Sequence, residues 1–168
     1  MRVITGTARG RVLRTLEGED VRPTTDRVKE AVFSIIQFEI EGRRVLDLFA
    51  GSGQLGIEAL SRGAASATFV DMSKDSLSTV KYNLEHTKLG DNAKVVQTDA
   101  LSFLKLTKDK FDIVFLDPPY ASSLVVDSMK LLSDVVAGGG PHQGGARAGL
   151  EGPWARRWGV GGYGVGRG

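Results

Sequence analysis

Cysteine is absent from the 168-residue chain. Its absence excludes a disulfide framework, a zinc site built on thiolates and a thiol nucleophile. The chain also lacks an apolar run long enough to span a bilayer, and no long apolar region follows its first two residues. Neither a membrane span nor a secretory signal is therefore predicted. We expect a soluble, cytoplasmic protein without a metal site.

The chain also lacks a strong net charge: its 22 Lys and Arg residues and 20 Asp and Glu residues give a formal net charge of +2. The balance changes along the chain. Residues 1–29 carry seven basic and four acidic side chains, residues 30–137 carry eleven and fifteen, and residues 138–168 carry four and one. A basic end on a mildly acidic body indicates contact with a polyanion, and a solvated surface is the open alternative.

The stretch VLDLFAGSGQLGIEALSRG, residues 45–63, predicts a strand, a glycine turn and a helix in direct succession. An apolar run broken by one carboxylate, Asp47, is typical of a strand covered on both faces. Gly51, Gly53 and Gly56 then form a G-x-G-x-x-G motif. Such glycines allow a tight turn, a close approach of backbone to a ligand, and close packing of the helix on the sheet. The motif indicates a nucleotide-type site or a packing turn.

Three further strands are predicted at residues 67–71, 93–97 and 111–116, with helices between the strands and a last helix at residues 124–132. This alternation predicts an α/β fold with a parallel sheet of order 3-2-1-4 and right-handed crossovers. Ligands bind outside the carboxyl ends of the strands in such sheets. Three carboxylates lie at these ends and are expected to share one site: Asp71, Asp99 and Asp117.

The N-terminal part predicts a hairpin, in which residues 2–5 and 11–14 flank a turn bounded by glycines. A helix is expected to begin at residues 23–26, with Thr or Asp as its cap. Its charged face would carry Arg27 and Lys29, close to the N–H groups that favour an anion at a helix N-terminus. The residues expected on its apolar face are Val28, Ala31, Val32, Ile35 and Ile36.

The chain changes character after residue 137, because 13 of residues 138–168 are glycine. A segment so rich in glycine loses much backbone entropy on ordering and has few apolar side chains to offset the loss. We predict a disordered, low-complexity tail, with stacking of Trp154 on nucleic-acid bases as the alternative. The predicted organisation is a basic hairpin and helix at residues 1–40, a core at residues 41–137, and the tail.

From about residue 1 to about residue 133, the chain resembles the S-adenosylmethionine-dependent methyltransferases that modify exocyclic amino groups. The glycine motif, the strand-end carboxylates and the D-P-P-Y motif at residues 117–120 carry this resemblance. Residues 22–33, RPTTDRVKEAVF, more narrowly resemble the bacterial 16S ribosomal RNA guanine-N2 methyltransferases of the RsmD family. The resemblance implies a Rossmann-like sheet, S-adenosylmethionine as methyl donor, and a monomer acting on 16S ribosomal RNA or the assembling small ribosomal subunit.

The resemblance also implies roles for individual residues. Asp47 would lie against the methionine end of the donor, Asp71 would hold the ribose hydroxyls, and Asp99 with Ala100 would meet the adenine. A buried carboxylate paired with a backbone N–H is a compatible interpretation of Asp47. The residues expected to bind the donor are Asp47, Phe49, Ala50, Gly51, Ser52, Gly53, Asp71, Asp99 and Ala100.

The D-P-P-Y motif is expected to carry the reaction. The exocyclic amine of guanine is a poor nucleophile because its lone pair is delocalised into the ring. The Asp117 carboxylate and the Pro118 carbonyl can accept hydrogen bonds from its two N–H groups, and the prolines hold that carbonyl rigidly. Tyr120 would stack on an unpaired or flipped base. The expected catalytic residues are Asp117, Pro118, Pro119 and Tyr120, and the expected phosphate contacts are Arg9, Arg11, Arg22, Arg27 and Lys29.

Three alternatives stay open. The D-P-P-Y motif alone does not choose the base, so an adenine-N6 methyltransferase acting on DNA or RNA is one of them. The glycine turn with Asp71 also fits a nicotinamide-dependent oxidoreductase. Relatives continue through a fifth strand and an antiparallel pair, whereas this chain turns glycine-rich after Leu132. The third alternative is therefore an inactive remnant whose fourth strand is an unpaired apolar edge.

Overall fold

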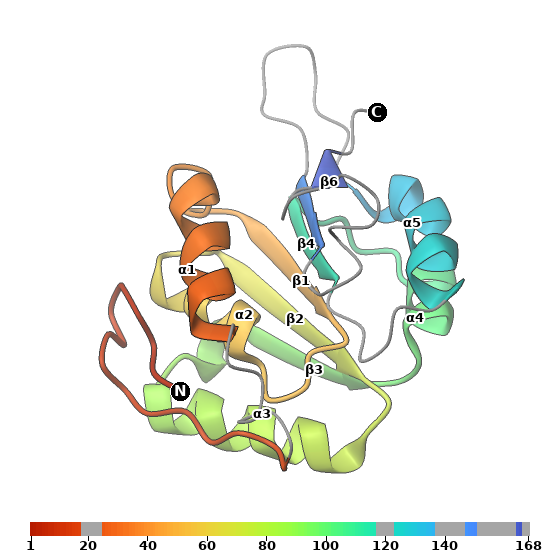
Figure 1. Ribbon diagram of the computed structural model, residues 1–168. Coiled ribbons are helices and arrows are strands. Elements are labelled where there is room, and N and C mark those ends of the chain that lie inside the picture. The colour runs from red at the N-terminus through yellow and green to blue at the C-terminus, as the bar shows by residue number, and fades with distance from the viewer. Residues whose placement is uncertain (18–24, 117–122, 137–146, 151–163, 166–168) are drawn as a thin grey trace.

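The structure, a computed structural model, describes residues 1–17, 25–116, 123–136, 147–150 and 164–165 (Figure 1). In that part of the chain, no helix is both long and apolar enough to cross a membrane. The helices and strands follow in the order α1 (Thr25–Ile36), β1 (Arg44–Leu48), α2 (Gln54–Ser61), β2 (Ser66–Asp71), α3 (Lys74–Thr87), β3 (Ala93–Gln97), α4 (Ala100–Leu106), β4 (Ile113–Leu116), α5 (Ser123–Val135), β5 (Arg147–Leu150) and β6 (Gly164–Val165).

The described strands form one sheet of order β3-β2-β1-β4-β5-β6. Every pairing is parallel except that of β5 with β6. β1 lies between β2 and β4, and its Asp47 is level with Phe69 of β2 and Phe115 of β4. The predicted order 3-2-1-4 and the α/β class are confirmed.

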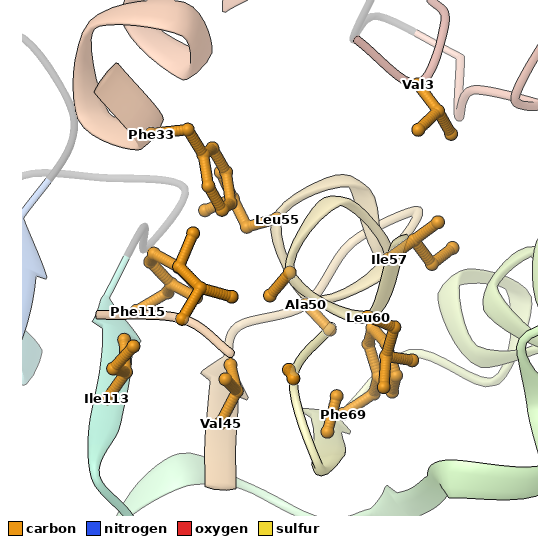
Figure 2. Close-up of a cluster of buried hydrophobic side chains, with 14 of the residues drawn as sticks. Val3, Phe33, Val45, Ala50, Leu55, Ile57, Leu60, Phe69, Ile113 and Phe115 are labelled. Carbon is orange, nitrogen blue, oxygen red and sulfur yellow. The ribbon is translucent and has the colours of Figure 1, made fainter. Parts of the chain in front are cut away.

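Helices cover both faces of the sheet: α1, α2 and α3 lie on one side, and α4 and α5 on the other (Figure 1). Two hydrophobic clusters correspond to these layers. Figure 2 shows Phe33 of α1 directed toward Leu55 of α2 and Phe115 of β4. The ring centroids of Phe33 and Phe115 are 5.6 Å apart. Because the central strands are covered on both faces, they read as continuous apolar runs in the sequence.

The N-terminal segment reverses direction where a hairpin was predicted. Its two arms pair through one isolated antiparallel bridge, between Arg2 and Val12, and not through two full strands. The Val3 N–H donates to the Arg11 carbonyl at 3.0 Å. Val3 is buried in the same cluster as the sheet and lies beside α2 (Figure 2). Gly6 has φ +94°, and a Cβ there would lie 1.8 Å from the Ser61 carbonyl oxygen, so only glycine fits this close approach.

The apolar face predicted for α1 is confirmed at Val32 and Ile36, which are buried, and wrong at Ala31 and Ile35. Ile35 is 46% exposed and Ala31 is also exposed, whereas Phe33 is buried. Lys29, which was expected on the charged outer face, is 1% exposed. The helix turns this lysine inward because a buried carboxylate, Glu58 of α2, lies there as its partner. Burial of a charge is tolerated only with such a partner.

The prediction of an unpaired β4 edge is also wrong. β5 pairs with β4 in parallel, from Ile113 opposite Arg147 to Leu116 opposite Leu150, and β6 adds to β5. Residues 147–150 and 164–165 are thus strands and not disordered tail, while the rest of the predicted tail lies outside the described residues. An apolar strand edge offers a row of backbone donors and acceptors. A segment can pair with this edge through its backbone without an alternating apolar sequence. The glycine-rich sequence therefore gave no indication of β5 and β6.

Arg44 and Asp112 join the starts of β1 and β4. The Asp112 carboxylate accepts from the Arg44 backbone N–H at 2.9 Å and from its guanidinium at 3.2 and 3.3 Å. Burial raises the pKa of Asp112, but the hydrogen bonds and positive charge of Arg44 outweigh it, so the pKa of this carboxyl is lowered. A carboxyl with a lowered pKa stabilises the fold above its unfolded pKa, and this contribution is lost as the pH falls through the folded pKa.

The Asp112→Asn variant should therefore lose about 1 kcal/mol of unfolding free energy at neutral pH, since the guanidinium is half exposed and screened. The difference from the parent protein should shrink as the pH falls through the folded pKa of Asp112. Urea denaturation of both proteins at a series of acidic pH values measures this difference in unfolding free energy. A difference that is independent of pH would contradict the assignment.

Candidate functional site

The turn between β1 and α2 is left-handed at three positions. Phe49, Gly51 and Gly53 have φ values of +66°, +57° and +85°. The Ala50 N–H, two residues past the end of β1, donates to the Val70 carbonyl of β2 at 2.9 Å. A left-handed conformation at the non-glycine Phe49 is strained. The turn is therefore held by its surroundings at the carboxyl edge of the sheet.

Gly56 and Gly53 of the motif are packed closely against neighbouring side chains. A Cβ at Gly56 would lie 2.4 Å from Cε1 of Phe69, and one at Gly53 would lie 3.1 Å from Cγ2 of Val80. Only glycine at position 56 lets α2 lie this close to β2. The close packing of helix on sheet that the motif predicts is confirmed.

Asp47 is 1% exposed, and its carboxylate accepts a hydrogen bond from the Gly56 N–H at 3.0 Å. This bond satisfies an N–H of the first helical turn, which has no partner within the helix. The interpretation of Asp47 as a buried carboxylate paired with backbone is confirmed. Its expected contact with a methyl donor stays a prediction.

Asp71 is the last residue of β2, and its carboxylate reaches back to the glycine turn. One oxygen accepts from the Gly51 N–H at 2.9 Å, and the other accepts from the Ser73 N–H at 2.8 Å. A carboxylate oxygen has two lone pairs, so each oxygen can accept one further bond. Two backbone donors thus fix the carboxylate beside the turn and leave capacity for hydroxyl groups.

Asp99 lies next to Asp71, at the carboxyl end of the neighbouring strand β3. The Thr98 N–H donates to the Asp71 carbonyl at 3.1 Å, and the Asp99 carboxylate caps α4 by accepting from the Ser102 N–H at 2.9 Å. The hydrogen bonds from Ser102 lower the pKa of Asp99. Ala100, the first residue of α4, is buried. The glycine turn, Asp71 and Asp99 therefore occupy one edge, as predicted from the strand ends.

Two polar residues at this edge were missed. Asn83 of α3 is fully buried and donates to the Ser52 carbonyl of the glycine turn at 3.0 Å. Gln54 opens α2 and is 9% exposed, and neither polar atom of its side chain has a hydrogen-bond partner within the described residues. The burial of Asn83 could have been predicted from the sequence, because helical periodicity places it on the same face as the apolar residues Val80 and Leu84.

The predicted catalytic residues Asp117, Pro118, Pro119 and Tyr120 lie outside the described residues. The last described residue before them is Leu116, which ends β4 level with Leu48 of β1. The D-P-P-Y motif thus begins directly after a strand that flanks the glycine turn. Its role stays a prediction.

The predicted phosphate contacts fall into three groups. Arg9, Arg11 and Arg27 are exposed, as a contact with RNA requires, and Arg22 lies outside the described residues. Lys29 is a correction: its Nζ lies 3.2 Å from Oε1 of Glu58 and donates to the Arg2 carbonyl at 3.1 Å. With 1% exposure it is removed from the phosphate-binding set.

Glu58 organises the contact between the N-terminal segment and α2. It is fully buried, and its carboxylate accepts from the N–H groups of Ile4 at 2.8 Å and Thr5 at 3.1 Å. It also pairs with Lys29 and, at 3.0 Å, with Arg62. The sequence signal was a charged residue between Ile57 and Ala59, in a helix of otherwise apolar, small or amide-bearing residues.

Comparison with known proteins gives consistent results. The family model described as Conserved hypothetical protein 95 matches residues 1–137. Ribosomal RNA small subunit methyltransferase D of Haemophilus influenzae is 42% identical over 137 residues, which are 80% of this chain and 71% of the relative. The Escherichia coli protein of the same name is 43% identical over 134 residues, 80% of this chain and 67% of the relative.

Solved structures share the fold. The one described as "Putative methyltransferase yhhF from Escherichia coli" superposes with a TM-score of 0.77 at 41% identity, covering 89% of this chain and 79% of that one. A hypothetical protein of Thermus thermophilus gives a TM-score of 0.73 at 32% identity, with coverage of 89% of this chain and 84% of that one. The match to the family model includes the glycine turn and the three strands around it.

Proposed function

Because the chain belongs to the Conserved hypothetical protein 95 family, whose members include ribosomal RNA methyltransferases, we propose that it methylates the exocyclic N2 of a guanine in 16S ribosomal RNA. It acts in the cytoplasm with S-adenosylmethionine as donor. One observation carries the proposal: the Asp71 carboxylate is fixed by the Gly51 N–H at 2.9 Å. An acid held against a glycine turn at the carboxyl edge of a parallel sheet is suited to bind ribose hydroxyls.

The residues present fit such a donor. Asp71 has acceptor capacity for both ribose hydroxyls, and Ala100 with Asp99 would border the adenine. The buried amide of Gln54 has no partner within the described residues, which is costly unless a polar ligand supplies one. The glycine turn would let backbone approach the methionine end. When bound, S-adenosylmethionine supplies an electrophilic methyl group on a sulfonium.

The D-P-P-Y motif would prepare the nucleophile. The Asp117 carboxylate and the Pro118 carbonyl accept hydrogen bonds from the two N–H groups of the amine, which turns the nitrogen lone pair toward the methyl group. Tyr120 holds the extruded base by stacking. Since the transfer discharges a sulfonium, these residues act by positioning and electrostatics and need no strong base.

Methyl transfer in parallel reactions tests the proposal. Labelled S-adenosylmethionine is offered with small ribosomal subunits lacking the modification, with deproteinised 16S ribosomal RNA and with a DNA duplex. Label in ribosomal RNA is expected, and label confined to DNA would contradict the substrate. Calorimetric titrations with S-adenosylhomocysteine and with NAD show which cofactor the protein binds. Binding of NAD alone would contradict the methyltransferase assignment.

Replacing Arg22 and Arg27 together by alanine should weaken RNA binding and flatten its dependence on salt. The logarithm of the RNA association constant falls linearly with the logarithm of the salt concentration. Each lost phosphate contact makes this fall less steep, by about 0.9 for a duplex and about 0.7 for a single strand. Filter binding across a salt series measures the slope. Lys94→Ala with Lys108→Ala is the control, because both lysines are exposed and belong to β3 and to the loop before β4, not to the N-terminal segment or α1. An unchanged slope in the arginine variant would remove both arginines from the phosphate contacts.

A further inference from the structure

Three exposed side chains form a stack along α3. The Cζ atom of Arg14 lies 3.6 Å from the ring centroid of Tyr82. The rings of Tyr82 and His86 are nearly parallel, with an interplanar angle of 8° and centroids 6.0 Å apart. Tyr82 is 41% exposed, and the other two side chains are exposed as well. The reaction chemistry above uses none of the three, which we call the Arg14 stack.

The backbone under the Arg14 stack is fixed without help from the stacked side chains. The Asn83 side chain accepts from the Arg14 N–H at 2.8 Å and donates to the Arg14 carbonyl at 2.9 Å. The same amide nitrogen donates to the Ser52 carbonyl of the glycine turn at 3.0 Å. Asn83 is fully buried. The Arg14 stack therefore has a set position beside the glycine turn, and its side chains are not needed to anchor the N-terminal segment.

The guanidinium of Arg14 is available to a ligand. Within the described residues it has no carboxylate partner, and the side chain is exposed. An exposed aromatic ring combined with a planar cation is the platform on which unpaired bases stack, and the cation also serves phosphates. Arg9 and Arg11 precede it on the same segment and are exposed, so the cationic surface continues along the hairpin.

We propose that the Arg14 stack is an RNA-contacting surface that stacks an unpaired base of the substrate near the methylated guanine. This inference rests on the proposed function, since the RNA is the one bound at the adjacent site. Arg14 supplies the planar cation and donors for the flanking phosphate, while Tyr82 and His86 supply the aromatic faces. An acidic protein partner would need the cation but not the flat ring, and the experiment separates the two.

The kinetic test compares Tyr82→Ala with Tyr82→Phe and with Phe38→Ala. Phe38 is a matched control, because it is 91% exposed and lies before β1, away from the carboxyl edge. Loss of stacking should weaken RNA binding, and raise KM for small subunits, by roughly 5- to 150-fold in Tyr82→Ala. Tyr82→Phe should stay close to the parent protein, and the affinity for S-adenosylhomocysteine should be unchanged in all three.

A Tyr82→Ala variant that matches Phe38→Ala in RNA affinity and KM would overturn the inference and leave the proposed function standing. A parent protein that binds 16S ribosomal RNA but transfers no methyl group would overturn the proposed function instead. Photo-crosslinking of the parent protein to 16S ribosomal RNA containing 4-thiouridine decides the case if Tyr82→Ala unfolds. Crosslinks on Tyr82 or His86 are expected, and crosslinks confined to other elements would refute the contact.

Discussion

Replacing Asp117 by alanine should lower the rate of methyl transfer by at least about 100-fold, the loss typical when one group of a preorganised site is removed. Without the carboxylate, the guanine amine lacks an acceptor for one of its N–H groups, and its lone pair stays in the ring. The affinity for S-adenosylhomocysteine should be largely unchanged. Single-turnover transfer and calorimetric titration of the same preparation measure the two quantities.

The Asp117→Asn variant refines this prediction, because its amide oxygen still accepts a hydrogen bond while the charge is lost. Its rate should lie between those of the parent protein and Asp117→Ala. Asp109→Ala is a control for the loss of an aspartate, since Asp109 is exposed and lies before β4. If Asp117→Ala loses cofactor affinity instead of transfer rate, Asp117 belongs to the donor site and the catalytic assignment is wrong.

The largest effect on stability is expected at Glu58. Its removal takes away the carboxylate that lies 3.2 Å from Nζ of Lys29, a side chain that is 1% exposed. The N–H groups of Ile4 and Thr5 lose their acceptor as well. Breaking a buried pair by removing one partner costs about 3–5 kcal/mol. Glu58→Ala should lose that much unfolding free energy, measured by urea denaturation with a two-state fit.

A double-mutant cycle identifies the cause. Lys29→Met removes the buried cation. The double variant Lys29→Met with Glu58→Ala should therefore lose less unfolding free energy than the two single variants lose together. Glu85→Ala is the control, because Glu85 is exposed on α3 and should change stability by less than about 0.5 kcal/mol. Strict additivity of the Lys29 and Glu58 variants would contradict the ion pair.

Glu58 also fixes the N-terminal segment, which carries predicted phosphate contacts, to α2. It lies on α2, the helix that begins at the glycine turn, and it holds the start of the N-terminal segment. Ser61 adds a second connection, because its hydroxyl donates to the Thr5 carbonyl at 2.7 Å and accepts from the Ala8 N–H at 3.0 Å. The exposed arginines Arg9 and Arg11 follow directly. The basic hairpin is therefore positioned by α2, the helix that begins at the glycine turn.

The sequence predicted the parts of the fold that follow from local periodicity. Apolar runs located the four parallel strands, and the G-x-G-x-x-G motif located the turn, since both depend on neighbours in the chain. The carboxyl ends of parallel strands meet at one edge, so the proximity of Asp71 and Asp99 to the glycine turn also followed. These features needed no knowledge of tertiary contacts beyond the sheet rule.

The features that the sequence missed depend on distant partners. Lys29 turns inward because Glu58 lies opposite it in space, 29 positions further along the chain, and helical periodicity contains no such information. Helical periodicity places Asn83 on the buried face of α3, but it does not identify Ser52 and Arg14 as the partners of its amide. β5 was missed because its glycine-rich sequence has no alternating apolar pattern that predicts a strand.

Nucleoside analysis of methylated RNA tests the central claim most directly. Small subunits lacking the modification are treated with the protein and labelled S-adenosylmethionine, the 16S ribosomal RNA is digested to nucleosides, and the label is assigned by mass spectrometry. The account predicts N2-methylguanosine as the labelled nucleoside, and at least about 100-fold slower formation of it with Asp117→Ala. Label found only in N6-methyladenosine, or no label from a folded protein that binds S-adenosylhomocysteine, would contradict it.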